Sequence, residues 1–178
     1  MRVVPTELPE VLVLEPTVHR DARGFFLETY QAERFAKAGI TAPFVQDNHS
    51  RSARGVLRGL HAQRTTPQGK LVRAILGEIW DVAVDIRPGS ATYGRWIGVT
   101  LDAAGFRQLW IPPGFLHGFC VMSEWAEIEY KCTAPYERDD EIGVVWNDPD
   151  IGIAWPITAP ALSPKDAALP RLSALSRA

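Results

Sequence analysis

The sequence predicts an all-β protein, a sandwich or barrel built from many short strands. From residue 44 onward, short apolar segments alternate with Gly/Pro turns at regular spacing. Residues 79–86 alternate with the period of two that a strand requires. Residues 31–38 form the only good helix pattern in the first part of the chain, so we expect few and short peripheral helices.

The N-terminal part is predicted to hold two strands and that helix. Residues 8–14 are apolar and β-branched enough for an opening strand. Residues 21–24 have the composition of a turn, and residues 25–30 are expected to continue as a strand. The helix at 31–38 ends where Gly39 supplies a C′ residue.

From residue 44 onward, the chain is predicted to consist of strands separated by turns. Gly77-Glu78 between two apolar segments predicts a hairpin. In the second segment Trp80, Val82, Val84 and Ile86 share one face, opposite Asp81, Ala83 and Asp85. The predicted strands are residues 70–76, 79–86, 96–101, 107–111, 117–122 and 126–132.

Composition indicates one domain and excludes several classes of protein. The chain has 178 residues and a formal charge of -2, which leaves no broad basic surface for nucleic acid. The first ten residues lack an apolar signal core, and no apolar segment approaches the ~20 residues of a membrane span. Cys120 and Cys132 are expected to be buried reduced thiols, so we expect a soluble, cytoplasmic protein.

Within this single domain, residues 1–178, three parts are expected. Residues 1–43 hold the N-terminal strands and helix, and residues 44–156 form the barrel core. Residues 157–178 are interrupted by prolines and are expected to wrap the outside of the barrel with one or two helical turns.

Polar side chains interrupt an apolar segment at residues 55–63. Arg58, His61 and Gln63 lie among Val56, Leu57 and Leu60. Burying such groups without partners costs a few kcal/mol each, so they are better explained as the wall of a pocket. In a regular strand Arg58 and His61 would point to opposite faces, but a bulge at Gly59 would bring both into one cavity. The alternative is one solvated arginine and one hydrogen-bonded core histidine.

Four further sites repeat this pattern. Lys70 opens a strand directly after Gly69, and His117 enters an apolar strand after a Pro-Pro-Gly turn. Tyr130 alternates with Ile128 and Cys132 on the inward face, so its hydroxyl needs a buried partner. Asp166 follows Lys165 in the C-terminal segment.

The segment Pro112-x-Gly114-x-x-His117 resembles half of the cupin jelly-roll signature. Metal-binding cupins carry a His-x-His pair in the other half, where this chain has His61-Ala62-Gln63. Two histidines are too few for a stable zinc or iron site. We therefore expect a cupin-like double-stranded β-helix without a catalytic metal; a metal-dependent cupin oxygenase is the disfavoured alternative.

Proton transfer is the chemistry that suits such a cavity. A histidine can act as a base near neutral pH, and a carboxylate on its other nitrogen would fix the tautomer. A lysine would stabilise an enolate, and a tyrosine on the opposite face would return the proton and invert the carbon centre. A substrate carbon beside a ketone would need no redox cofactor.

The chain resembles the dTDP-4-dehydrorhamnose 3,5-epimerase family, metal-free cupins of bacterial dTDP-L-rhamnose synthesis. The similarity runs from about residue 8 to residue 166. It is carried by RGFFLE at 23–28, FVQDNHS at 44–50, GVLRGLH at 55–61, QGKLVR at 68–73, DVAVDIR at 81–87, QLWIP at 108–112, GF at 118–119 and WNDP at 146–149.

The resemblance implies a role for each matching residue. His61 would remove protons from C3 and C5 beside the C4 ketone, with Asp166 as its partner. Lys70 would stabilise the enolate, and Tyr130 would reprotonate the other face. Arg58, together with Arg23 of a partner subunit, would hold the diphosphate. The remaining nucleotide and sugar contacts would come from Phe26, Glu28, Gln46, Asn48, His117 and Tyr136.

The resemblance also implies a homodimer that exchanges its N-terminal strands, and a product used for lipopolysaccharide or cell-wall polysaccharide. Two departures lie near the substrate. Ala134-Pro135-Tyr136 keeps one tyrosine of a pair that is frequent in the family, and the loop before Gln68 is shorter. The departures leave open a single-centre epimerase or ketoisomerase of a dTDP-4-keto-6-deoxy sugar; a non-catalytic nucleotide-sugar-binding cupin is a separate alternative.

Overall fold

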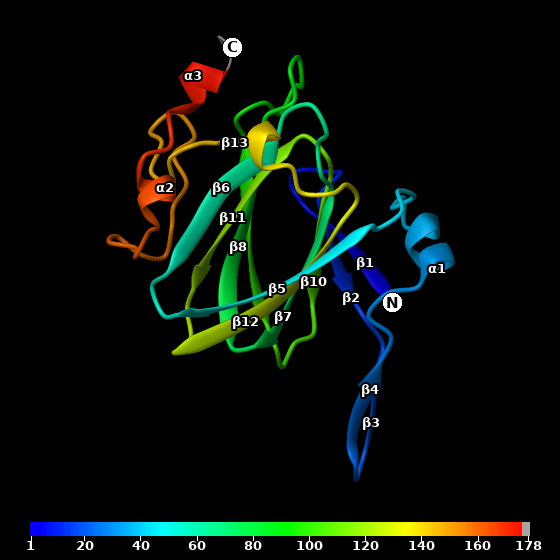
Figure 1. Cartoon of the computed structure of the whole chain (residues 1–178). Helices are drawn as coiled ribbons and strands as arrows, with labels where there is room; N and C mark the ends of the chain where they lie inside the picture. Colours follow the sequence, from blue (N-terminus) through cyan, green and yellow to red (C-terminus); the bar gives the residue numbers. More distant parts are fainter. Residues whose placement is uncertain (176–178) are drawn as a thin grey trace.

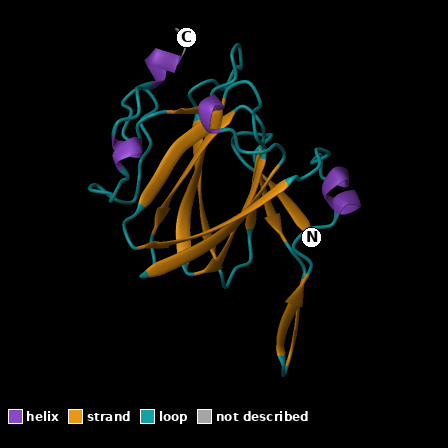
Figure 2. Ribbon diagram, in the orientation of Figure 1, coloured by secondary structure: helices purple, strands orange, loops and turns teal. Residues whose placement is uncertain are grey.

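The computed structural model describes residues 1–175 and forms a β-barrel of two antiparallel sheets that face each other (Figure 1). Within these residues, one sheet has six strands in the order β1-β2-β10-β7-β12-β5. The other has five, in the order β13-β6-β11-β8-β9. Helices are short and lie outside the sheets (Figure 2). The predicted all-β, cupin-like jelly roll is confirmed.

The elements have the following bounds. The strands are β1 (Arg2–Pro5), β2 (Leu12–Glu15), β3 (Val18–Asp21), β4 (Gly24–Leu27), β5 (Gln46–Ala53), β6 (Leu57–Gln63), β7 (Lys70–Leu76), β8 (Glu78–Asp85), β9 (Trp96–Asp102), β10 (Gln108–Ile111), β11 (Phe115–Val121), β12 (Trp125–Cys132) and β13 (Glu141–Gly143). The helices are α1 (Ala32–Lys37), α2 (Pro164–Ala167) and α3 (Leu172–Leu175), with a 3₁₀ turn at Arg138–Asp140.

The main core lies between the two sheets. Val72, Leu109 and Ile128 of the six-stranded sheet are in one buried cluster with Ile79 and Phe119 of the five-stranded sheet. Because this cluster occupies only part of the barrel interior, the polar residues of the same strands can line a cavity in the remainder.

Both sheets are also covered from outside. The C-terminal segment contributes Ile151 and Leu172 to a second cluster with Val82 and Val84 of β8. Figure 1 shows this segment, in orange and red, running along the outer side of β6 and β11. On the other sheet, Phe35 of α1 packs in a third cluster with Trp110. The central strands are therefore buried on both faces.

The helix prediction is confirmed almost to the residue. The Gln31 side chain caps α1 by accepting a hydrogen bond from the Arg34 amide, and Gly39 follows the C-cap with φ of +89°. A positive φ is the conformation for which a C′ glycine is selected.

The predicted hairpin at Gly77 is wrong. β7 pairs with β10 and β12, whereas β8 pairs with β11 and β9, so the two strands belong to different sheets. Gly77, with φ of +69°, lies at the turn where the chain passes from the six-stranded sheet to the five-stranded sheet. A tight turn between two apolar strands looks the same in sequence whether the strands pair or separate.

Other boundaries differ near the termini. The strand predicted over 8–14 is β2, which begins only at Leu12, and the strand predicted over 25–30 is β4, which ends at Leu27. The sequence did not indicate β1, β3 or β13. The predicted helical turns of the C-terminal segment are α2 and α3, while residues 176–178 of that segment lie outside the described residues. The division of the chain after residues 43 and 156 stays a prediction.

The predicted bulge at Gly59 is confirmed. His61 of β6 pairs with His117 of β11, but Arg58 pairs with Phe119, so three steps on β6 match two on β11. Gly59 has φ of +114°, and a Cβ there would lie 2.6 Å from the Cα of Gly118 and from the carbonyl oxygen of His117. No other residue fits this position without moving the neighbouring strand.

Two predictions about the chain as a whole can be compared with the structure. Cys120 and Cys132 are both free and buried, as expected. Among residues 1–175, the helices are all too short to cross a membrane.

We predict that Gly59→Ala destabilises the fold by about 1–3 kcal/mol, because it combines a strained φ with a backbone clash. Urea denaturation measures this as a lower midpoint at unchanged slope. Gly89→Ala is the matched control, since Gly89 also has positive φ (+77°) but open space around its Cβ position. Equal losses in the two variants would contradict the close approach of β6 and β11.

Candidate active site

A cavity of about 540 Å³ opens inside the barrel beside the core. Its walls come from β6, β7, β11 and β12, and from the segment that leads into α2. Six of the residues singled out in the sequence line it: Arg58, His61, Lys70, His117, Tyr130 and Asp166.

His61 and Asp166 form the central contact of the cavity. His61 Nε2 lies 2.6 Å from Asp166 Oδ1, although the two residues are 105 positions apart. Asp166 is held at the start of α2, where its amide donates to the Ser163 side chain. An ionised carboxylate can only accept, so Nε2 donates and Nδ1 carries the lone pair. Burial lowers the pKa of His61 below its ordinary value, and Asp166 opposes that effect.

Lys70 and Tyr130 occupy neighbouring strands of the opposite sheet. Burial lowers the pKa of Lys70, while Cys132 and Asp81 act to raise it. Burial raises the pKa of Tyr130, so its hydroxyl keeps its proton. The prediction that this hydroxyl has a buried partner is wrong. Within residues 1–175 the hydroxyl makes no hydrogen bond, and Tyr130 lines the cavity instead.

His117 belongs to a second histidine–aspartate pair that the sequence analysis missed. His117 Nε2 lies 2.6 Å from Asp81 Oδ1, and Asp81 is fully buried. Asp81 Oδ2 has no hydrogen-bond partner among the described residues. The alternation of β8, which groups Asp81 with Ala83 on one face, was the available signal.

Arg58 is the cationic group of the cavity on β6. Its guanidinium donates to the Ser52 hydroxyl from Nε and Nη2 at 3.1 and 3.0 Å. The bulge at Gly59 therefore does what the sequence predicted, since Arg58 and His61 line the same cavity.

Gln46, Asn48 and Tyr136 form a separate hydrogen-bonded group. Gln46 Oε1 accepts from the Tyr136 amide at 2.8 Å, and Gln46 Nε2 donates to Asn48 Oδ1 at 3.0 Å. Asn48 in turn donates to Cys132 Sγ at 3.5 Å. The Tyr136 hydroxyl donates to Glu141 at 2.7 Å.

Arg23, Phe26 and Glu28 lie away from the cavity within one chain. Arg23 and Phe26 are on the β3–β4 hairpin, which extends from the barrel as an arm (Figure 1). Arg23 pairs with Asp21, and Phe26 is 71% exposed. Glu28 pairs with Arg34 at 3.0 Å. The single chain does not bring these three residues to His61.

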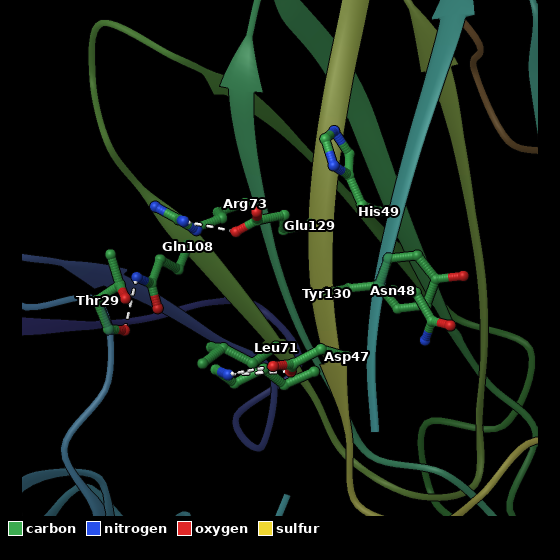
Figure 3. A pocket seen from close by; sticks show the side chains of 10 residues that line it. Thr29, Asp47, Asn48, His49, Leu71, Arg73, Gln108, Glu129 and Tyr130 are labelled. Carbon is green, nitrogen blue, oxygen red and sulfur yellow. Dashed lines mark hydrogen bonds and ion pairs between the residues drawn. The ribbon is translucent and has the colours of Figure 1, made fainter. Parts of the chain in front are cut away.

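A second, smaller cavity of about 200 Å³ lies on the outer face of the six-stranded sheet (Figure 3). Its charged groups are already paired, Arg73 with Glu129 and Lys131 with Asp47. Figure 3 shows the Tyr130 ring directed away from the Arg73–Glu129 pair. His61 and Lys70 do not line this cavity, so we assign the chemistry to the larger one.

Gln63 stands where metal-binding cupins have a ligand. Its amide nitrogen donates to the carbonyl oxygens of Thr66 and Pro135, and its oxygen accepts from the Glu137 amide. Both ends of the side chain are therefore engaged in holding loops. Within the described part of the chain, no group of three or more His, Cys, Asp or Glu residues could hold a metal ion.

Comparisons with known proteins agree with this geometry. The sequence model of the dTDP-4-dehydrorhamnose 3,5-epimerase family matches residues 5–174. A relative of that name from Shigella flexneri is 54% identical, with 93% of each chain covered. Another from Neisseria gonorrhoeae is also 54% identical over 94% of this chain, which spans only 52% of that longer relative.

A solved structure shares the fold throughout. The crystal structure of a dTDP-6-deoxy-D-glucose-3,5-epimerase from Legionella pneumophila, in complex with dTDP-4-keto-L-rhamnose, superposes with a TM-score of 0.95. It is 49% identical and covers 97% of this chain and 93% of its own. On its sequence, its fold and its cavity, the chain belongs to the dTDP-4-dehydrorhamnose 3,5-epimerase family.

Proposed function

We propose that the protein epimerises dTDP-4-dehydro-6-deoxy-D-glucose at C3 and C5 to dTDP-4-dehydro-L-rhamnose, a step of dTDP-L-rhamnose biosynthesis. The observation that carries this proposal is the single cavity that holds a carboxylate-bound histidine, a half-buried lysine and a tyrosine whose hydroxyl has no hydrogen-bond partner among residues 1–175. Family membership supports the identity of the substrate.

In the proposed reaction His61 Nδ1 removes the proton from a carbon next to the C4 ketone. The electrons of the broken C–H bond move into the enolate, whose oxygen Lys70 stabilises. Asp166 stabilises the imidazolium that forms. General acid–base catalysis contributes about 10²–10⁴-fold in rate, which suffices for a proton already acidified by a ketone. The reaction requires no cofactor.

Tyr130 completes the inversion by giving a proton to the opposite face of the enolate. Two features support this role. Its raised pKa keeps the phenol protonated, and it has no protein partner among the described residues that would compete for the proton. Water must then take the proton from His61 and return one to Tyr130, after which the same steps at the second carbon account for both inversions.

Binding of the nucleotide diphosphate is proposed for Arg58, whose planar guanidinium suits bidentate contact with phosphate oxygens. His117 would line the sugar site, and Gln46, Asn48 and Tyr136 would contribute contacts at its rim.

We further propose a homodimer in which the arm of one chain completes the cavity of the other. A two-stranded hairpin is marginally stable alone, and β3–β4 exposes Phe25 and Phe26 by 56% and 71%. Burial against a partner would stabilise the arm and would bring Arg23, Phe26 and Glu28 to the nucleotide.

We predict that incubation with dTDP-4-dehydro-6-deoxy-D-glucose in deuterated water labels both C3 and C5, as read by NMR. His61→Ala should lower the rate of labelling by about 10²–10⁴-fold. His49→Ala is the matched control, because His49 is exposed on the outer face and pairs with Glu127. One labelled carbon would indicate the single-centre alternative, and unchanged labelling in His61→Ala would contradict the proposed base.

We predict that Tyr130→Phe lowers kcat by about 10²-fold or more at nearly unchanged KM, because the hydroxyl acts in proton transfer rather than in binding. Steady-state kinetics measures this. Tyr93→Phe provides the control, since Tyr93 is partly exposed beside a different cavity. A large rise in KM at unchanged kcat would show that the hydroxyl only binds substrate.

A further inference from the structure

Glu141 is a carboxylate beside His61 that the sequence analysis did not single out. It opens β13, which pairs with β6 so that Glu141 lies opposite Gln63 and Gly143 opposite His61. Its side chain is only 11% exposed, and Oε1 lies 3.7 Å from His61 Nδ1. The imidazole is therefore placed between two carboxylates, Asp166 at Nε2 and Glu141 at Nδ1.

The two oxygens of Glu141 have different partners. Oε2 accepts a hydrogen bond from the Tyr136 hydroxyl and forms an ion pair with Lys165. Oε1 is the oxygen that faces the histidine. This division keeps the carboxylate in one orientation, with Oε1 toward Nδ1.

Lys165 also links this contact to the His61–Asp166 pair, because Lys165 immediately precedes Asp166 on α2. The same short helix is thus attached at two points, by Lys165 to Glu141 and by Asp166 to His61. Through these contacts Glu141 connects β13 with α2 and with Tyr136, which lies in the segment after β12.

We infer that Glu141 is a positioning residue for the His61 base: it holds α2 through Lys165 and presents a negative oxygen to Nδ1, the atom that gains the proton. The inference rests on the proposed role of His61 and deepens it. When Nδ1 is unprotonated, its lone pair lies near a carboxylate, which is unfavourable. When Nδ1 takes the proton the same carboxylate stabilises the imidazolium, so the contact favours the product of proton abstraction.

The charges around His61 agree with this role. Burial lowers the pKa of His61, Asp166 and Glu141 act to raise it, and Lys165 acts to lower it. Burial would raise the pKa of Glu141, but the contacts with Lys165 and Tyr136 outweigh it, so the group stays ionised. The other titratable or charged groups that line the cavity are Arg58, Lys70, His117 and Tyr130.

The test is an NMR titration of the His61 ring nitrogens in the substrate-free protein, using three variants. In Glu141→Gln we expect the pKa of His61 to fall, because a negative charge that raises this pKa is lost. In Lys165→Met we expect it to rise, because the compensating cation is lost while Glu141 remains and Asp166 stays held by its hydrogen bond to Ser163. Glu137→Gln, an exposed carboxylate four residues away, should leave the titration unchanged.

Opposite shifts in Glu141→Gln and Lys165→Met support the inference. Shifts of the same sign would overturn it, since a contact that only held α2 would be lost equally in both variants. An unchanged titration in Glu141→Gln would also overturn it. Because no substrate is present, the result does not depend on whether the protein is an epimerase.

Kinetics give a second readout. The acid limb of the kcat/KM pH profile should move to lower pH in Glu141→Gln and to higher pH in Lys165→Met. In Glu141→Gln kcat should also fall on the order of tenfold, a smaller loss than removal of His61 would cause. A rise in KM alone would contradict a role in orienting the base.

Discussion

The hydrogen bond between His61 and Asp166 is the interaction on which the rest of the site depends. It joins β6, in the barrel wall, to α2, in a segment 105 residues further along the chain. The same segment is anchored beside the cavity by the Leu57 amide, which donates to the Ala161 carbonyl at 3.1 Å. Without the C-terminal segment the cavity would lack one wall, and the imidazole would lack the acceptor that selects its tautomer.

The barrel supplies the environment in which these few groups are effective. Its apolar cluster fills one part of the interior and leaves the polar residues in a region of low dielectric, where charge interactions are strong. A buried charge is costly unless it is paired. Asp81 is in hydrogen-bond contact with His117, and it also acts to raise the pKa of Lys70. The structure thus retains ionisable groups inside the barrel by placing groups of opposite charge near them.

The fold and most of the cavity were predictable from sequence because both depend on local patterns. Period-two alternation located the strands, and an arginine and a histidine around Gly59 indicated a bulge into a pocket. The pairing at Gly77 was not predictable, since a turn does not specify which sheet the next strand joins. Glu141 follows a charged stretch, Glu137 to Asp140, in which nothing distinguishes a surface carboxylate from one beside His61. Its position depends on the pairing of β13 with β6, a contact between distant segments.

The role of His61 as the base is tested most directly by determining the tautomer of its ring in the substrate-free protein. NMR couplings between the ring nitrogens and their protons show which nitrogen carries the proton. We predict a proton on Nε2, with a low-field resonance from the short contact to Asp166, and none on Nδ1 above the pKa of the ring. Asp166→Ala, which leaves no acceptor at this position, should remove this resonance. A proton on Nδ1 in the native protein, or the same ring state in native protein and variant, would contradict the proposed base.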